Sequence, residues 1–324
     1  MKEFAIGIDL GGTNTRIALI NRKGEILSFE EFPTHSDQQG VSVVREVSVQ
    51  INAILEKQKC PKENVEGIGL GCAGILSFQK GILYFSPNLP ALSNLPIGKL
   101  LEKETGLKTF LENDANAAAL GEHWLGAGNG INNIILVTLG TGIGSGILLN
   151  GEVWHGSNGF AGEFGHTTLF PDGIPCKCGK KGCVEVYCSA PAIVRFVRKQ
   201  LEEGNNSSLR DEERILTSRI IFEHAANGDE LALDVFRQAG TYLGIALSNV
   251  FNLLDLDMAI LGGKVSEAGD CILQPVREEV KRMAISSPYY PPQVLKAKLG
   301  DNAGVLGAAR LVFKNADCGI KNMN

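Results

Sequence analysis

Residues 4–32 alternate apolar and polar positions in short runs, which is the pattern of half-buried strands. The runs read AIGIDL, TRIALI and EILSFEEF, and the turn-forming segments GGTN and NRKG separate them. Apolar residues then recur at helical spacing over 41–57, and 64–76 resumes as a buried strand. A meander of three strands followed by helix and strand predicts an α/β fold.

A second copy of the opening pattern begins at residue 132. The stretch 132–153 aligns with 3–26 when one gap of two residues follows Asn150, so that Thr138 corresponds to Asp9. Because strand, glycine turn and strand agree together, we interpret the chain as an internally duplicated fold.

The remaining elements are predicted from hydrophobic periodicity. The charged stretch 195–230 indicates a solvated helical region with an exposed GNNSS loop. A long helical pattern, the strand DMAILGG and a glycine-rich helix start, GDNAGVLGAARLVF, follow it.

Composition narrows the class of partner. The chain has 324 residues, 44% hydrophobic and 21% charged, with a net charge of −5. This acidic balance gives no general attraction for nucleic acid or an anionic membrane surface, so we expect a small-molecule ligand. Neither a secretion signal nor 18 consecutive apolar residues is visible, which predicts a cytoplasmic protein.

Glycine-rich turns are the first candidate binding elements, because they let several backbone N–H groups point at one anion. Two such turns at matching positions predict a grip on a polyphosphate, although each is also compatible with an ordinary hairpin turn. Asp9 suits a Mg²⁺ ion held through water, or it caps its own turn. Neither the dinucleotide spacing G-x-G-x-x-G nor a P-loop occurs. The candidate residues are Asp9, Gly11, Gly12, Thr13 and Asn14 in the first turn, Gly140, Thr141 and Gly142 in the second, and Gly262 with Gly263 after a later strand.

The segment LENDANAAALGE contains a candidate general base, because a polar triplet directly precedes an alanine-rich helix start there. Asp114 is placed just before the second glycine strand, where the two halves should meet. Phosphoryl transfer to an alcohol needs a carboxylate there to orient the hydroxyl and accept its proton. The competing interpretation is that Asp114 is the helix N-cap.

Four residues form a candidate metal site with the spacing H-x9-C-x-C-x4-C: His166, Cys176, Cys178 and Cys183. Three thiolates and an imidazole predict a closed, tetrahedral, structural Zn²⁺ site. Reduced cysteines beside an unrelated histidine are the alternative, and Cys188 is a rival ligand. Glu163 and Glu185 flank the cluster, so that a metal would fix both carboxylates as acceptors for a polyol.

These segments together resemble the ROK family of sugar kinases, within the actin and hexokinase superfamily. The matching motifs are DLGGTNTR, LENDANAAALGE, TLGTGIGSGI, GFAGEFGH, CKCGKKGCVE and GDNAGVLGAA. The resemblance implies two actin-like, ribonuclease H-like domains with nucleotide and sugar in the cleft between them. It places the first domain at 1–115, closed by a C-terminal helix at about 303–324, and the second at 116–302.

The resemblance also implies the chemistry: transfer from ATP·Mg²⁺ to a hexose 6-hydroxyl in a homo-oligomer, a dimer or tetramer. Asp114 would be the base, and the sugar ligands would be Asn88, Asn113, Asp114, Glu163, His166 and Glu185. The phosphate loops would be those at Gly11 and Gly140, with Gly262 and Gly263 near the adenosine. Glucose is the leading substrate, with N-acetylmannosamine, N-acetylglucosamine or fructose as alternatives.

One departure bears on the sugar. The family usually has a Pro-Gly pair after the strand, where this chain has Cys72-Ala73-Gly74, which affects the shape of the sugar-side loop. Two alternatives from other classes are a non-catalytic sugar sensor and a sugar-responsive repressor. Repressors of this family carry a DNA-binding domain before the first glycine strand, which here begins at Phe4.

Overall fold

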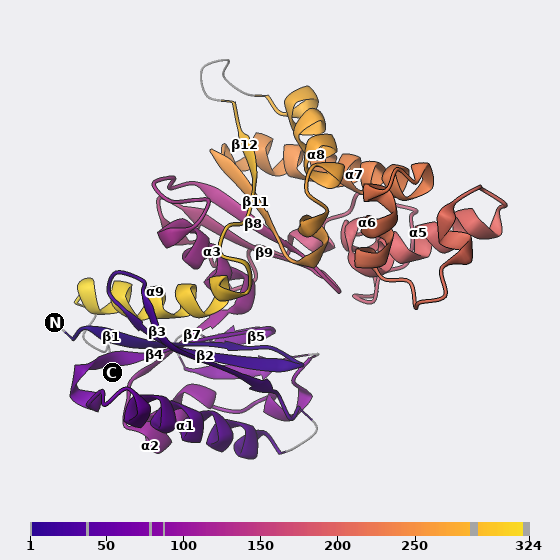
Figure 1. The fold of residues 1–324 in the computed structure, drawn as a ribbon. Helices are drawn as coiled ribbons and strands as arrows, with labels where there is room; N and C mark the ends of the chain where they lie inside the picture. Colours follow the sequence, from indigo (N-terminus) through magenta and orange to yellow (C-terminus); the bar gives the residue numbers. More distant parts are fainter. Residues whose placement is uncertain (1, 37–38, 78–79, 87, 286–290, 320–324) are drawn as a thin grey trace. The chain divides into compact units, whose positions relative to one another are not determined.

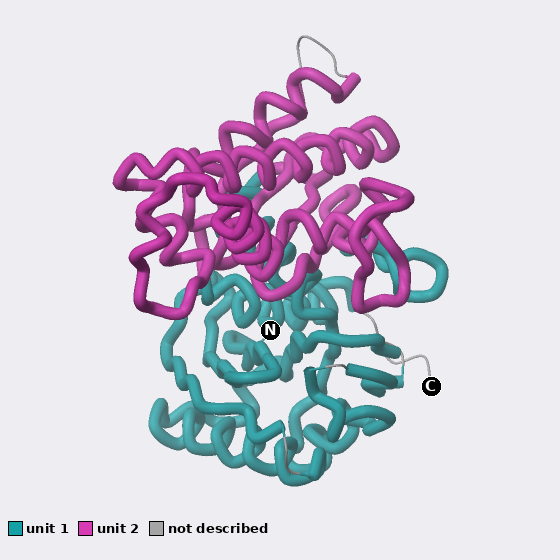
Figure 2. Tube along the Cα trace, turned by 90° about the vertical axis from the view of Figure 1, so that its right-hand side faces the viewer, with its two compact units in different colours: residues 1–130, 153–161, 301–324 teal, residues 131–152, 162–300 magenta. Residues whose placement is uncertain are grey.

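The computed structural model describes residues 2–36, 39–77, 80–86, 88–285 and 291–319. Its contacts divide the chain into two compact units, shown in Figure 2: unit 1 is 1–130, 153–161 and 301–324, and unit 2 is 131–152 and 162–300. Unit 1 continues to Gly130, beyond the expected boundary at 115, because α3 (Asp114–Leu125) packs against α9 (Ala303–Asp317). Residues 320–324 of the predicted C-terminal helix lie outside the described part.

Unit 1 is built on a mixed five-stranded sheet in the order β3-β2-β1-β4-β7. β1, β2 and β3 form the antiparallel meander, and β4 and β7 add parallel to β1. Helices α1 and α2 lie on one face of this sheet, and α3 and α9 lie on the other (Figure 1). The bounds are β1 Phe4–Leu10, β2 Asn14–Asn21, β3 Ile26–Pro33, α1 Gly40–Lys57, β4 Val65–Cys72, α2 Ile97–Thr105 and β7 Thr109–Asn113.

The structure confirms the predicted meander and the predicted first helix. The strand predicted at 64–76, however, is interrupted. β4 ends at Cys72, and Gly74 has a φ of +137°, which only glycine adopts readily. A Cβ on Gly74 would also lie 2.4 Å from the carbonyl oxygen of Phe85. The chain therefore turns there into a separate hairpin of β5 (Ile75–Ser77) and β6 (Ile82–Phe85).

Small residues bring α9 into direct contact with the sheet. A Cβ on Gly69 of β4 would lie 1.9 Å from the carbonyl oxygen of Ala308, and one on Gly7 of β1 would lie 2.0 Å from that of Val305. Helix and strands thus touch backbone to backbone. This close packing fixes the start of α9 beside the carboxyl end of β1.

Unit 2 repeats the architecture, with the strand order β10-β9-β8-β11-β12. β8 pairs antiparallel with β9 and parallel with β11, and β11 pairs parallel with β12. The order and these strand directions match unit 1 and confirm the duplication. The strands are β8 Ile134–Leu139, β9 Ile143–Leu149, β10 Glu152–Val153, β11 Met258–Gly262 and β12 Gln293–Lys296.

Helices complete the core of unit 2. α7 and α8 pack on each other, and buried residues of α5, α6 and α7 join one apolar cluster with β8 and β11. The helices are α4 Glu185–Cys188, α5 Ala190–Glu202, α6 Ser218–Ala226, α7 Glu230–Leu254 and α8 Asp270–Met283. Short 3₁₀ turns lie at Lys62–Asn64, Pro90–Leu92, Phe164–His166, Ser208–Asp211, Lys264–Ala268 and Gly300–Asn302. Among the described helices none is long and apolar enough to cross a membrane.

Candidate active site

Carboxylates gather at the carboxyl ends of β1 and β7, the two parallel strands on either side of β4 in unit 1. Leu10 of β1 pairs with Cys72 of β4, and Cys72 pairs with Asn113 of β7, so Asp9 and Asp114, the residues beside Leu10 and Asn113, come from the two strand ends that flank β4. Burial raises the pKa of the Cys72 thiol, and the charges of Asp114, Asp9 and then Glu112 raise it further. Cys72 therefore lies within the negative field of the carboxylates.

The N-cap of α3 is Asn113, so the interpretation of Asp114 as the cap is wrong. The Asn113 side-chain oxygen accepts hydrogen bonds from the backbone of Ala115 at 3.0 Å and of Asn116 at 3.3 Å. Asp114 is then the first residue of the helix, where its negative charge is favoured by the helix dipole. Capping does not account for its carboxylate.

Asp9 is the most strongly perturbed carboxyl of this group. Burial first, and the charge of Asp114 second, raise its pKa to about 6, although Arg16 at 3.7 Å acts in the opposite direction. Helix α9 also approaches it closely, because a Cβ on Gly304 would lie 2.9 Å from the Asp9 carboxyl carbon. Because the charge of Asp114 raises the pKa of Asp9, a cation bound beside these two carboxylates would be stabilised.

We expect Asp9→Asn to stabilise unit 1 at neutral pH when no nucleotide or metal is bound. The folded protein holds the Asp9 proton more tightly than the unfolded chain does. The stability from this group is therefore full below about pH 4 and is lost as the pH rises to about 6. Asparagine should gain up to about 3 kcal/mol at pH 8, and much less near pH 4. Thermal unfolding across this range measures the gain; a gain independent of pH would contradict the ionised pair.

The first glycine turn contacts Asn88, another predicted sugar ligand. Gly11 donates to the carbonyl oxygen of Asn14 at 3.0 Å, which closes the turn. A Cβ on Gly12 would lie 2.9 Å from the Cβ of Asn88, so these residues are in direct contact. The Asn14 amide donates to Glu31 at 2.7 Å, and Thr13 is exposed. Unit 1 thus holds Asp9, the glycine turn, Asn88, Asn113 and Asp114 together.

In unit 2 the second glycine turn lies against Glu185. The Glu185 carboxylate accepts from the backbone of Ile143 at 3.0 Å, and a Cβ on Gly142 would lie 2.6 Å from the same oxygen. The carbonyl oxygen of Gly140 accepts from Ala190, the first residue of α5. A predicted sugar ligand, a predicted phosphate turn and a helix N-terminus therefore form one assembly.

A cavity of about 610 Å³ opens beside this turn. Thr141 lies on its wall, together with residues along the length of α5 and at the start of α6. Gly262 is the last residue of β11, and Gly263 after it has a φ of +80°, with a Cβ that would lie 2.5 Å from the carbonyl oxygen of Leu139. The cavity is lined by Thr141, Pro191, Val194, Arg198, Leu216 and Thr217, among others.

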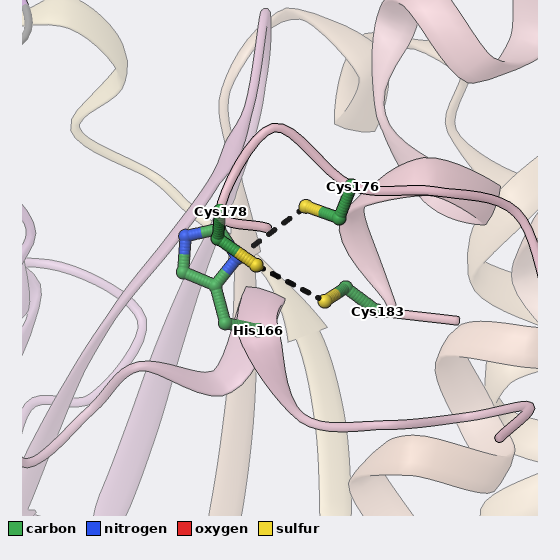
Figure 3. A group of neighbouring side chains, drawn as sticks. All are labelled: His166, Cys176, Cys178 and Cys183. Carbon is green, nitrogen blue, oxygen red and sulfur yellow. Dashed lines mark hydrogen bonds between the residues drawn. The ribbon is translucent and has the colours of Figure 1, made fainter. Parts of the chain in front are cut away.

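The four predicted metal ligands converge, as Figure 3 shows. One ligand atom from each of His166, Cys176, Cys178 and Cys183 lies within 4.8 Å of all the others. The His166 Nδ1 is 3.8 Å from the Cys176 sulfur, and the Cys178 and Cys183 sulfurs are 3.6 Å apart. With metal–sulfur bonds of about 2.3 Å, a tetrahedral zinc site has sulfur–sulfur edges of about 3.8 Å. The donor set and its spacing fit Zn²⁺.

Ionisation of the Cys183 thiol is disfavoured when no cation is bound. Burial and the neighbouring Cys178 and Cys176 hold the pKa of the Cys183 thiol well above its usual range. The rival ligand Cys188 is fully buried elsewhere and donates to the carbonyl oxygen of Ala239 at 3.4 Å. The convergent group is therefore the one predicted, without Cys188.

Glu163 and His166 belong to the same short 3₁₀ turn. The Glu163 carbonyl oxygen accepts from the backbone of His166 at 3.0 Å, and the Glu163 side chain is exposed. The Glu185 carboxylate lies 4.0 Å from the Cys176 sulfur. In unit 2, Glu163 is thus joined through its backbone to His166 of the cluster, whereas Glu185 lies beside both Cys176 and the glycine turn.

Two residues that the sequence reasoning did not select lie beside the predicted base. Glu112 is buried at 1% exposure and contacts the His155 Nε2 at 2.8 Å. Glu112 precedes Asn113 in β7, and a buried acid in a strand is unusual enough to have drawn attention. His155 gives no local signal, because its partner is 43 residues away.

Comparisons with known proteins show what the chain is similar to. The model of the ROK family matches residues 5–315. A glucokinase of Halalkalibacterium halodurans is 38% identical over 311 residues, covering 95% of this chain and 94% of that protein. A xylose repressor of Caldicellulosiruptor bescii is 31% identical over 315 residues, covering 96% of this chain and 78% of the repressor.

Among solved structures, the chain is similar to a ROK family glucokinase of Streptomyces griseus in complex with glucose and AMPPNP. The TM-score is 0.80 at 34% identity, covering 96% of this chain and 99% of that chain. The expected fold class, α/β with two actin-like domains, is confirmed by this similarity and by the two mixed sheets.

Proposed function

The chain belongs to the ROK family, and we propose that it is an ATP-dependent glucose kinase that phosphorylates the sugar 6-hydroxyl. The observation that carries the proposal is the pair of carboxylates, Asp9 and Asp114, at the ends of the two strands that flank β4, beside a glycine turn. Phosphoryl transfer requires a base for the acceptor hydroxyl and neutralisation of the phosphate charges. This pair offers one carboxylate for each task.

Asp114 is the proposed base. It accepts the proton of the 6-hydroxyl while the sugar oxygen bonds to the γ-phosphorus and the bond to the β–γ bridging oxygen breaks, releasing ADP. Asp9 is the proposed anchor for Mg²⁺, held through water. The ion, when bound, neutralises phosphate charge and lowers the pKa of Asp9 toward its usual value. Asn88 and Asn113 offer amides to the sugar hydroxyls.

The nucleotide is proposed to lie against the glycine turns. Gly11, Gly12, Thr13 and Asn14 in unit 1, and Gly140, Thr141 and Gly142 in unit 2, supply backbone donors for the phosphates. The start of α5, joined to Gly140, adds the positive end of a helix. The adenine of the nucleotide would occupy the cavity beside Thr141, with Gly262 and Gly263 near the ribose.

Zinc is proposed to hold the sugar-binding segment of unit 2 in place. His166, Cys176, Cys178 and Cys183 would be its ligands, and a site with four protein ligands leaves no position for a reacting water. The ion would fix the imidazole, so that His166 binds metal through Nδ1 and meets the sugar through Nε2. Glu163 and Glu185 would accept sugar hydroxyls on either side.

A coupled assay of ADP release across hexoses tests the function. Glucose should give the highest kcat/KM, ahead of N-acetylmannosamine, N-acetylglucosamine and fructose. With 6-deoxyglucose, which lacks the accepting hydroxyl, ADP release should fall to the sugar-free rate. Turnover with none of these sugars would overturn the proposal and favour the second candidate, a sugar-responsive regulator, which the similarity to a xylose repressor supports.

The expected cytoplasmic location and the dimeric or tetrameric state stay predictions. Light scattering of the purified chain at micromolar concentration measures the oligomeric state directly.

A further inference from the structure

Glu112 and His155 form a contact that the proposed roles leave unexplained. The Glu112 carboxylate is 1% exposed and the His155 side chain is 35% exposed, with 2.8 Å between Oε2 and Nε2. Burying a carboxylate is costly unless several donors satisfy it. A buried acid directly before the predicted base therefore calls for a specific use.

The Glu112 carboxylate is fully engaged as an acceptor. Its Oε1 accepts from the backbone of Asn113 and from the Asn116 side chain, both at 2.9 Å, and its Oε2 meets His155. Burial alone would lower the pKa of His155, but the hydrogen bond and the charge of Glu112 outweigh it and leave that pKa raised. The contact is thus a charge-assisted hydrogen bond with little exposure to water on the acid side.

The same carboxylate holds the residues around Asp114. Asn113 precedes Asp114 and caps α3, and Asn116 lies in the first turn of that helix. Any shift of Glu112 would move the donors on both sides of the base. Orientation errors of about 1 Å at a reacting group can cost about 10²-fold in rate.

His155 comes from a segment with an unusual path. Residues 153–161 belong to unit 1, whereas the chain on either side of them belongs to unit 2. The segment is folded on itself, since Ala161 donates to the carbonyl oxygen of His155 at 3.1 Å and Gly156 has a φ of +69°. Directly after it, the chain continues through Gly162 to Glu163 and His166.

We propose that His155 and Glu112 are a pair of positioning residues that fasten the segment 153–161 to the strand end carrying Asn113 and Asp114. Two consequences follow, resting on the proposed kinase function. The pair keeps the base aligned through Asn113 and Asn116. It also fixes one end of the segment that leads to Glu163 and His166, so that sugar affinity depends on it.

The test compares His155→Ala with His155→Gln, whose amide can still donate to Glu112. In the alanine variant we expect the KM for glucose to rise and kcat/KM for glucose to fall about 10–100-fold, as when an outer partner of a ligand is removed. The KM for ATP should change less than about threefold. Glutamine should recover most of the loss, which a role in packing alone would not produce.

A double-mutant cycle in kcat/KM ties the effect to the pair. If His155 and Glu112 act together, His155→Ala combined with Glu112→Gln should be little worse than the poorer single variant. The matched control is His35→Ala, because His35 and Glu46 form an exposed pair 3.9 Å apart in the same unit. That variant should keep wild-type kinetics.

Glucose binding can be measured by tryptophan fluorescence, because Trp154 adjoins His155. The outcomes below distinguish a failure of the kinase proposal from a failure of the positioning pair. Wild-type protein without turnover on any sugar would refute the kinase proposal itself. Active wild-type protein with an unchanged His155→Ala variant, or with glutamine as damaging as alanine, would refute the positioning pair. Strictly additive effects in the cycle would also refute it.

Discussion

Asp114→Asn is expected to lower kcat by about 10²–10⁴-fold, the usual contribution of a positioned general base. Asparagine has the same shape but cannot accept the proton of the 6-hydroxyl. Glucose affinity, measured by fluorescence titration, should stay within about threefold, because the loss lies in the transition state. A rapid-quench measurement of a single turnover would confirm that the chemical step is the one affected.

Stability provides the first control for this variant. Asn113 makes the cap of α3, so Asp114→Asn leaves the cap in place and loses the interaction with the helix dipole, worth about 0.3–1 kcal/mol. Asp317→Asn is the matched control on the surface of the same unit, where Asp317 pairs with Arg22 at 2.8 Å. It should leave kcat unchanged. An Asp114→Asn variant with wild-type kcat would place the base elsewhere.

Local patterns predicted the fold well because each signal was carried by neighbouring residues. Alternation and turn residues placed the meander at 4–32, and helical spacing placed α1 within one residue of its start. The match between 132–153 and 3–26 anticipated two sheets with the same strand order. The strand at 64–76 was predicted too long, because its break depends on the φ of Gly74, which composition does not reveal.

Side-chain roles were harder to predict where two residues compete for one function. Asn113 and Asp114 both suit an N-cap, and only the hydrogen bonds to Ala115 and Asn116 decide between them. Cys188 is close enough in sequence to bind a metal, but its helix turns the thiol toward Ala239. The boundary at 115 could not anticipate the packing of α3 on α9, which joins residues about 190 positions apart.

The contact between Glu112 and His155 could not be predicted from the sequence. Each residue has an ordinary local setting, a strand and a loop, and the pairing depends on a segment that leaves unit 2 and returns to unit 1. Contacts of this kind follow from the topology rather than from spacing. The group of four candidate metal ligands is the opposite case, since three of them lie within eight residues and their types alone predicted the group.

Removing zinc is expected to have the second large effect. Cys183→Ser should reduce bound zinc from one ion per chain to near zero, measured by elemental analysis of the purified protein. Because the ion binds the folded state, the unfolding temperature should also fall, and stripping wild-type protein with a chelator should have the same result. The KM for glucose should rise about 10–100-fold, with a smaller change in the KM for ATP, since the cluster supports Glu163, His166 and Glu185.

The chain supplies its own controls for this experiment. Cys60→Ser and Cys188→Ser remove thiols outside the cluster, so both should retain a full zinc content, and Cys60→Ser should keep wild-type kinetics as well. Loss of zinc in Cys188→Ser without loss in Cys183→Ser would show that Cys188, and not Cys183, is the ligand. Fully active wild-type protein without zinc would refute the zinc proposal. The positions of Glu163 and Glu185 would then rest on the 3₁₀ turn and on the hydrogen bond to Ile143 alone.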